Sequence, residues 1–237
     1  MSSRFISLLL GILFFLLFVA FSYLVHKDVF NQIDFNTMVR LQDNISRRFD
    51  EPFSWLSEVG KFEVMVLVLV SILLARRKII GGIVALGLFA GFHFIEIYGK
   101  FFVEHLPPPQ FLLRTKHMVD FPQFHVRAEN SYPSGHSGRT IFISAILIIL
   151  ILQSKRLPTM VKCVLIGSIL IYDIAMLVSR VYLGEHWTTD VVGGGMLGLS
   201  FGLLSSILLS KKDNSKATST GFLPKFPKYK IEIKKVE

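Results

Sequence analysis

The chain has 237 residues, of which 51% are hydrophobic, and its mean hydropathy is +0.53. This composition is too apolar for an ordinary soluble domain and indicates a protein with several membrane spans. The net charge of +9 does not indicate nucleic-acid binding, because much of it lies beside apolar runs and in the tail, where it suits an anionic membrane surface. The single cysteine, Cys163, lies within an apolar run, so neither a disulfide framework nor a cysteine metal site is expected.

The first half of the chain contains three apolar runs. Residues 5–25 form an uninterrupted run that lacks the small-residue exit of a cleaved signal peptide, so we expect a retained first span. Residues 27–61 mix charged with apolar side chains, a pattern that indicates interfacial helices on the membrane surface. The runs 62–75 and 79–102 predict the second and third spans.

The second half begins with a polar loop, residues 103–131, whose prolines exclude the interior of a helix. Residues 140–152 predict a fourth span, which we expect to start in the Pro-Ser-Gly-His turn before it. The runs 160–183 and 189–210 predict the fifth and sixth spans. The sequence therefore predicts an all-α, six-span membrane domain over residues 1–210, followed by a basic cytoplasmic tail, residues 211–237.

Positive residues in the short connections predict the orientation. In a six-span arrangement they fall on one side, which marks the cytoplasm: Arg4, Arg76, Arg77, Lys78, Lys155, Arg156, Lys211 and Lys212. We therefore expect a multi-pass protein of a plasma membrane of the prokaryotic type, with both termini inside and the long polar loops outside.

Glycines spaced four residues apart predict close helix contacts, which lipid alone does not drive. Gly194, Gly198 and Gly202 form such a row on the sixth span, and Gly87 and Gly91 form one on the third.

The first chemical motif is Pro133-Ser134-Gly135-His136, at the expected start of the fourth span. Gly135 permits a sharp turn, so that the hydroxyl of Ser134 and nearby N–H groups can converge on an anion at a helix start. His136 would then lie over the bound group as a proton donor. On its own, the motif also fits a loop histidine beside a tight turn.

The second motif runs from Arg180 to Asp190. A guanidinium at the end of the fifth span suits bidentate phosphate binding. His186 and Asp190 lie four residues apart, which is one helical turn, and a carboxylate on one ring nitrogen leaves the other to act as nucleophile or base. Taken singly, a snorkelling arginine and a helix start capped by Thr188 or Thr189 are alternative interpretations.

Together, the two motifs resemble the second and third signatures of the type 2 phosphatidic acid phosphatase (PAP2) superfamily, over about residues 100–195. The resemblance implies a six-helix membrane bundle that removes phosphate from lipids through a phosphohistidine, with no metal or other cofactor. It implies that His186 is the nucleophile, Asp190 its orienting carboxylate and His136 the acid for the leaving oxygen. Ser134, Gly135 and Arg180 would bind the phosphate.

The first signature of that family departs from the pattern. The family has a lysine, six residues and then Arg-Pro, whereas here Lys100 is followed after six residues by Pro107-Pro108. Lys100 can still bind phosphate. For the missing cation we expect Arg139, one turn beyond His136, ahead of Arg114 and Arg127 in the outer loop. The alternative is a site that works with less positive charge.

Two polar groups lie within the expected spans. His93, Glu96 and Lys100 share one face of the third span, and Asp173 lies on the fifth. Such groups usually face the bundle interior and one another, so buried polar pairing with no catalytic part is the favoured interpretation. In the alternative, Glu96 orients Lys100 and Asp173 pairs with a basic side chain of another span. A metal at His93 and Glu96 is not expected, because no second carboxylate–histidine pair appears.

The sequence thus predicts a membrane enzyme that hydrolyses a lipid phosphate: phosphatidic acid, phosphatidylglycerol phosphate, a polyprenyl (pyro)phosphate or a glycolipid phosphate. Membrane lipids and the substrate are the expected partners, with no nucleic acid and no obligatory protein partner. Two alternatives stay open. The same site could transfer the phosphoryl group to an acceptor lipid, or the altered first signature could mark a non-catalytic lipid-binding protein.

Overall fold

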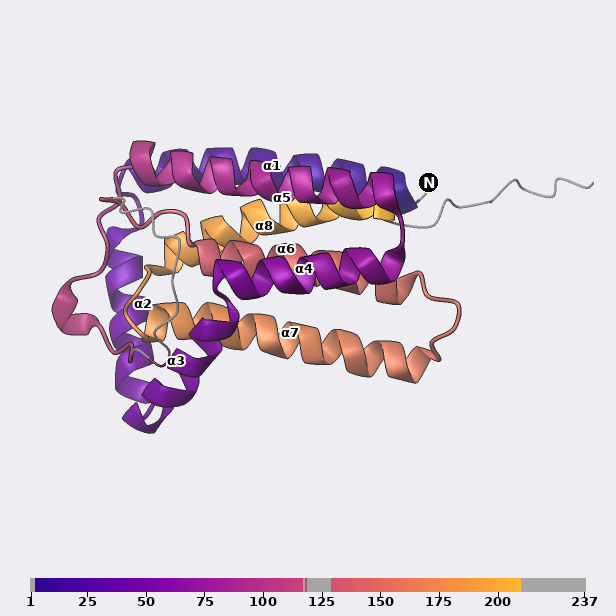
Figure 1. Cartoon of the computed structure of the whole chain (residues 1–237). Coiled ribbons are helices and arrows are strands. Elements are labelled where there is room, and N and C mark those ends of the chain that lie inside the picture. Colours follow the sequence, from indigo (N-terminus) through magenta and orange to yellow (C-terminus); the bar gives the residue numbers. More distant parts are fainter. Residues whose placement is uncertain (1–2, 117, 119–128, 210–237) are drawn as a thin grey trace, which may run out of the picture.

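The structure is a computed structural model that describes residues 3–116, 118 and 129–209 (Figure 1). The basic tail and Arg127 lie outside these residues. The helices, in chain order, are α1 (Ser3–His26), α2 (Asn31–Asn44), η1 (Arg47–Phe49), α3 (Asp50–Val59), α4 (Phe62–Arg76), α5 (Ile79–Phe102), η2 (Gln110–Leu112), α6 (Gly135–Leu152), α7 (Thr159–Tyr182) and α8 (Thr188–Leu209). The long apolar runs therefore fold as the sequence predicts, and α6 does begin inside the Pro-Ser-Gly-His segment.

Helix α8 is the centre of the bundle and packs against α1, α5 and α6 (Figure 1). Its glycine row allows this, because a Cβ on Gly194 or Gly198 would overlap a backbone carbonyl of α6 or of the residue before it. At Gly202 the added Cβ would lie 2.6 Å from a third carbonyl oxygen, that of Phe142. The predicted close contact of the sixth span is confirmed.

The glycine row predicted for α5 behaves differently. A Cβ on Gly87 would meet no atom within 4 Å, and one on Gly91 would lie 3.3 Å from the Phe201 ring. The prediction of a close contact is therefore wrong for Gly87, which lies on an exposed face of the bundle. Spacing alone does not distinguish a packed glycine face from one that faces outward.

The outer faces of the bundle are apolar, as a lipid environment requires. Ile171 and Ile174 of α7 are 70% and 63% exposed, and Leu16 of α1 is 60% exposed. By length and composition, α1, α5, α6, α7 and α8 can each cross a membrane. The structure thus confirms an all-α architecture with five candidate spans among the described residues.

The second predicted span, residues 62–75, is the one not among these five, and it corresponds to α4, which has 15 residues. At about 1.5 Å per residue it is about 22 Å long, shorter than a hydrocarbon layer of about 30 Å. It nevertheless lies alongside α5 and α6 in the bundle (Figure 1) and contributes Met65, Leu69 and Leu73 to a buried cluster with Phe89 and Phe142. The structure does not confirm the count of six.

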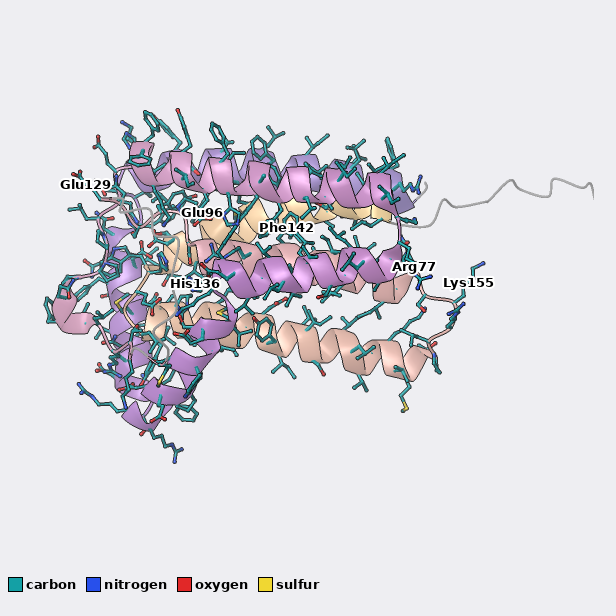
Figure 2. All side chains as sticks on the ribbon, in the orientation of Figure 1. Arg77, Glu96, Glu129, His136, Phe142 and Lys155 are labelled. Atoms are coloured by element: carbon teal, nitrogen blue, oxygen red, sulfur yellow. The ribbon has the colours of Figure 1, made fainter. Side chains whose placement is uncertain are left out.

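Residues 27–61, predicted to be interfacial, form α2, η1 and α3 across one end of the bundle (Figure 1). The side-chain amide of Gln42 on α2 donates to the carbonyls of Leu112 and Tyr182, at 2.7 and 2.9 Å. Arg77 and Lys155 lie at the opposite end of the bundle, whereas His136 lies nearer the end that carries α2 and α3 (Figure 2). The bundle thus separates the basic connections from both chemical motifs.

Candidate active site

The turn between α7 and α8 positions His186. The backbone N–H groups of Glu185 and His186 both donate to the carbonyl of Arg180, at 3.2 and 3.3 Å. Gly184 makes this helix end possible, because its φ of +72° lies in the left-handed region that favours glycine. The chain therefore turns sharply from the buried Arg180 to His186, just before α8 begins.

The carboxylate of Asp190, in the first turn of α8, orients the ring of His186. Its Oδ2 lies 3.2 Å from Nδ1 of His186 and accepts a hydrogen bond from the Trp187 backbone N–H at 3.0 Å. A carboxylate on Nδ1 favours the tautomer with the proton on that nitrogen. Nε2 of His186 then carries the free lone pair that a nucleophile needs.

The Pro-Ser-Gly-His segment lies directly beside this pair. The backbone N–H of Ser134 donates to the carbonyl of Asp190 at 2.9 Å, and Ser137 donates to the hydroxyl of Ser134 at 3.2 Å. A Cβ on Gly135 would overlap the Glu96 carboxylate, so glycine is needed here for space rather than for a turn. The two motifs, far apart in sequence, thus meet at the start of α6 and α8.

Positive side chains surround His136. Arg180, Arg139, His186 and Lys100 all lie close enough to interact with His136 electrostatically. The Nε2 atom of His136 is buried and has no hydrogen-bond partner among the described residues. A group with developing negative charge would find in this space one unsatisfied ring nitrogen and several cations.

Two of these cations are held by neighbouring groups. Arg180 is fully buried, pairs with the carboxylate of Glu185 and donates to the hydroxyl of Ser57 at 2.6 Å. Lys100 donates to the backbone carbonyl of Ser131 at 3.2 Å. Ser57 and Glu185, neither of which was predicted from the sequence, therefore compensate the buried charge of Arg180.

Arg139, expected to replace the missing first-signature arginine, points toward the same region. Its Nε donates to the carbonyl of Gly60 at 3.2 Å, and a Cβ on Gly60 would lie 2.8 Å from the ring of His136. Its terminal nitrogen lies 3.6 Å from a Glu96 carboxylate oxygen. Arg139 and His136 thus both lie against Gly60, and one terminal nitrogen of the guanidinium pairs with Glu96.

Arg114, the alternative cation that the structure describes, contacts an aromatic ring. The guanidinium of Arg114 lies 5.1 Å from the centre of the Tyr182 ring, an arrangement typical of a cation–π contact. Pro107, at the position of the expected arginine, is exposed and lines a cavity together with Asp34 of α2.

Two expected pairings differ in the structure. The direct partners of Glu96 among the described residues are His93, at 2.9 Å, and Arg139, rather than Lys100. Asp173 accepts a hydrogen bond from the hydroxyl of Ser144 at 2.6 Å, so the prediction of a basic partner is wrong. A hydroxyl satisfies a buried carboxyl without introducing a second charge.

Two residues near the His186–Asp190 pair, His105 and Asp34, were not predicted from the sequence. Nδ1 of His105 lies 2.8 Å from Oδ1 of Asp190, and its Nε2 lies 3.6 Å from Asp34. Asp34 also accepts hydrogen bonds from the backbone N–H and the hydroxyl of Thr189, at 2.8 and 2.6 Å. The only signal for His105 was its position between Lys100 and Pro107.

The charges around His105 and Asp34 affect how they titrate. Burial alone would lower the pKa of His105, but its hydrogen bond to Asp190 and the nearby carboxylates outweigh burial and raise it. Burial also raises the pKa of Asp34, although the bonds from Thr189 and the charge of His105 oppose this shift. The nearby carboxylates therefore favour the protonated form of His105.

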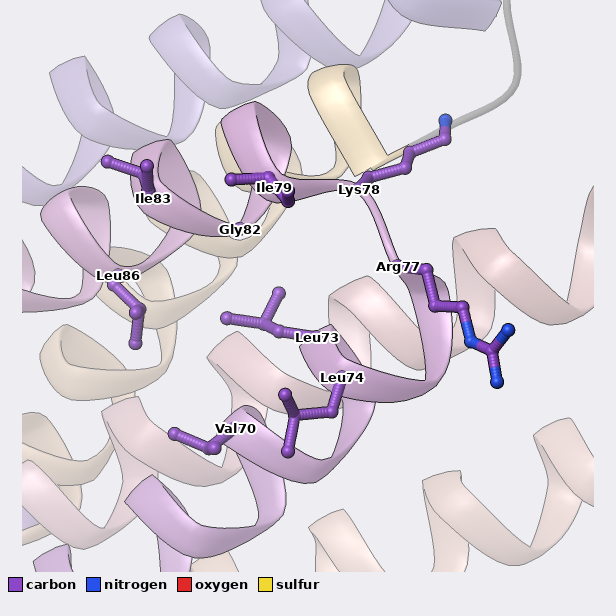
Figure 3. Close-up of a pocket in the computed structure, with 9 residues that line it drawn as sticks. All are labelled: Val70, Leu73, Leu74, Arg77, Lys78, Ile79, Gly82, Ile83 and Leu86. Atoms are coloured by element: carbon purple, nitrogen blue, oxygen red, sulfur yellow. The ribbon is translucent and has the colours of Figure 1, made fainter.

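Two cavities flank different parts of the bundle. One of about 960 Å³ lies at the end of the bundle that carries α2, and its lining includes His105, Asp34, Trp187 and Pro107. The other, of about 440 Å³, lies between α4 and α5 and is lined mainly by apolar side chains, with Arg77 directed away from it (Figure 3). The second cavity suits lipid chains and lies at the end remote from His136.

No group of three or more His, Cys, Asp or Glu side chains in the described ranges is arranged to hold a metal ion.

Known proteins resemble this chain in sequence and in fold. The profile of the PAP2 superfamily matches residues 66–213. Phosphatidylglycerophosphatase B of Bacillus subtilis (strain 168) is 39% identical over 82 residues, which is 34% of this chain and 39% of that protein. The crystal structure of a transmembrane PAP2-type phosphatidylglycerolphosphate phosphatase from Bacillus subtilis superposes with a TM-score of 0.65 and 21% identity, covering 82% of this chain and 93% of that one. Because the sequence identity to this crystal structure is only 21%, the match supports the fold alone.

Proposed function

Because the chain belongs to the PAP2 superfamily, we propose that it is a lipid phosphatase in which His186 attacks phosphorus. The observation that supports this most is the 3.2 Å contact between Asp190 and Nδ1 of His186, which leaves Nε2 free. Nε2 forms a bond to phosphorus while the bond from phosphorus to the lipid oxygen breaks. His136 donates its proton to that leaving oxygen.

The second half of the reaction regenerates the enzyme. A water molecule attacks the phosphohistidine, and His136, now unprotonated, accepts the proton of that water. The bond from phosphorus to Nε2 breaks, inorganic phosphate leaves, and both histidines return to their starting states. The expected roles of His186, His136 and Asp190 thus form one cycle in which atoms and charge balance.

Positive and hydrogen-bonding groups stabilise the charge on the equatorial phosphate oxygens. We assign this role to Arg180, Lys100 and Arg139, together with Ser134 and the N–H of Gly135 at the start of α6. Arg180 would exchange part of its contact with Glu185 for phosphate. Because these cations can meet the charge, we propose a reaction that needs no metal ion.

The substrate we propose is a phosphorylated membrane lipid. Both relatives carry names that specify phosphatidylglycerol phosphate, so this lipid is our first candidate. Phosphatidic acid, a polyprenyl (pyro)phosphate and a glycolipid phosphate are the others. The sequence match spans 39% of the curated relative, so the headgroup preference is a question for experiment.

We further propose that α4 also crosses the plasma membrane, as a short span that brings the total to six. Six crossings put both termini and the connections containing Arg77 and Lys155 on one side, which positive residues mark as the cytoplasm. His186 and α2 would then face outward. A lipid phosphate in the outer leaflet would reach the site at the depth of its own headgroup.

The test is phosphate release from the purified protein in detergent, over a panel of the four lipid classes with and without an acceptor lipid. The matched variants are His186→Ala and His26→Ala, since His26 is a histidine at the end of α1 outside the site. We expect release by the wild type and by His26→Ala, but not by His186→Ala. No release from any lipid by the wild type would favour the non-catalytic alternative.

A further inference from the structure

We propose that His105 is a positioning residue whose ring N–H at Nδ1 holds the Asp190 carboxylate in the orientation that serves His186. This inference rests on the proposed function, since it assigns a task to a neighbour of the proposed nucleophile. It adds a second histidine to the proposed pair of His186 and Asp190.

The carboxylate of Asp190 has different partners on its two oxygens. Oδ2 faces His186 and the Trp187 N–H, whereas Oδ1 faces His105 Nδ1 at 2.8 Å. Asp190 is fully buried, so an unpartnered oxygen would carry a large desolvation cost. Donors on both oxygens prevent rotation of the carboxylate and keep Oδ2 on His186.

The position of His105 is itself well determined. Its backbone N–H donates to the side chain of Asn130 at 3.1 Å, and its carbonyl accepts from the N–H of Ser131 at 2.9 Å. Asn130 also donates to the carbonyl of Lys100 at 3.2 Å. The same short segment therefore joins Lys100, His105 and the residues that lead into the Pro-Ser-Gly-His motif.

The groups that face His105 favour its charged form. Asp190 on α8 and Asp34 on α2 flank the two ring nitrogens, and Asp28 adds a more distant negative charge. The Tyr132 ring also lies near His105, with the two ring centres 6.4 Å apart and their planes at 86°. Nδ1 donates to Asp190, and the negative charge of Asp34, 3.6 Å from Nε2, adds an electrostatic preference for the protonated ring.

This arrangement separates the contribution of His105 from substrate binding. His105 touches the oxygen of Asp190 that His186 does not use, so its loss should lower kcat while leaving KM nearly unchanged. Losing a group that orients a functional side chain typically costs about 10–100-fold.

Substitutions at His105 separate its orienting of Asp190 from a general packing role. In His105→Asn the side-chain amide nitrogen takes the place of Nδ1, whereas in His105→Gln it reaches toward the place of Nε2. Leu106→Ala is the control, since that neighbouring side chain is 73% exposed. Imidazole can be added to His105→Ala, because His105 lines the cavity of about 960 Å³.

The experiment measures kcat and KM for phosphatidylglycerol phosphate in detergent micelles, with thermal unfolding of each variant. We expect His105→Ala to lose about 10–100-fold in kcat with KM within about twofold of the wild type. His105→Asn should recover most of the loss, because its amide N–H replaces the Nδ1 donor to Asp190, and His105→Gln should recover little. Millimolar imidazole should restore part of the activity of His105→Ala.

Three results would overturn the inference. His105→Ala could turn over like the wild type, or Ala, Asn and Gln variants could lose activity equally together with their thermal stability. The third is wild-type turnover by His186→Ala in the same assay, which would remove the proposed function and the inference with it. The first two results leave the proposed function intact.

Discussion

Replacing Arg139 by alanine should reduce both stability and turnover, by separable amounts. The side chains of Arg139 and Glu96 are each 9% exposed, and their charged atoms lie 3.6 Å apart. Removing the guanidinium leaves the buried carboxylate with His93 as its direct partner. Breaking a buried pair from one side typically costs about 3–5 kcal/mol in the free energy of unfolding.

The loss of turnover has a different origin. Arg139 and His136 meet at Gly60, so the guanidinium can reach the charge that develops on phosphate. Losing one such donor costs about 2–4 kcal/mol of transition-state stabilisation, or roughly a hundredfold or more in kcat. Arg139→Lys should recover only part, because lysine lacks the planar fork.

A double-mutant cycle with Glu96→Gln separates the two effects. Denaturant unfolding in micelles should show Arg139→Ala/Glu96→Gln to be more stable than Arg139→Ala, since the unpaired charge has gone. Its kcat should stay low, because the phosphate still lacks the guanidinium. If the double variant turns over as fast as Glu96→Gln alone, Arg139 acts only through the ion pair and our assignment fails. A larger loss in Arg114→Ala than in Arg139→Ala would place the cation in the loop.

Three further predictions follow from the bundle and the site. Activity should survive EDTA and be inhibited by vanadate, a mimic of five-coordinate phosphorus; complete loss on chelation, restored by a divalent ion, would contradict the metal-free reaction. Gly198→Ala should lower the thermal unfolding temperature, because its Cβ would overlap a carbonyl of α6, whereas Gly87→Ala should not; equal effects would show that helix propensity dominates. In a Cys163→Ser background, Glu129→Cys should react with an impermeant maleimide in intact cells and Lys155→Cys should not, and the reverse labelling would put the site in the cytoplasm.

Much of the fold was predictable because local rules decide it. Apolar runs, bounded by charges and prolines, predict α1, α5, α7 and α8 to within two residues at each end. The glycine row on α8 predicted its close helix contacts, since close approach of backbones needs the absence of a Cβ. The row on α5 looked alike in sequence, but Gly87 lies on an exposed face, and which face a helix buries depends on the whole assembly.

The site was predictable only where residues belong to motifs. The two signatures predicted that His136, Arg180, His186 and Asp190 belong together, and the structure brings them to one region. His105 lies 85 residues from Asp190 along the chain, in a loop with no regular pattern, so their contact depends on tertiary packing. The same holds for Asp34 on α2 and for the hydroxyl partner of Asp173, which charge pairing alone predicted wrongly.

The central claim is that His186 carries the phosphoryl group, and trapping that intermediate tests it most directly. The wild type is mixed briefly with radiolabelled lipid phosphate, quenched with base and digested, and the labelled peptide is identified by mass spectrometry. The account predicts an alkali-stable, acid-labile phosphate on His186 of the wild type, and no label in His186→Ala. Label on another residue, or steady release of phosphate by His186→Ala, would contradict it.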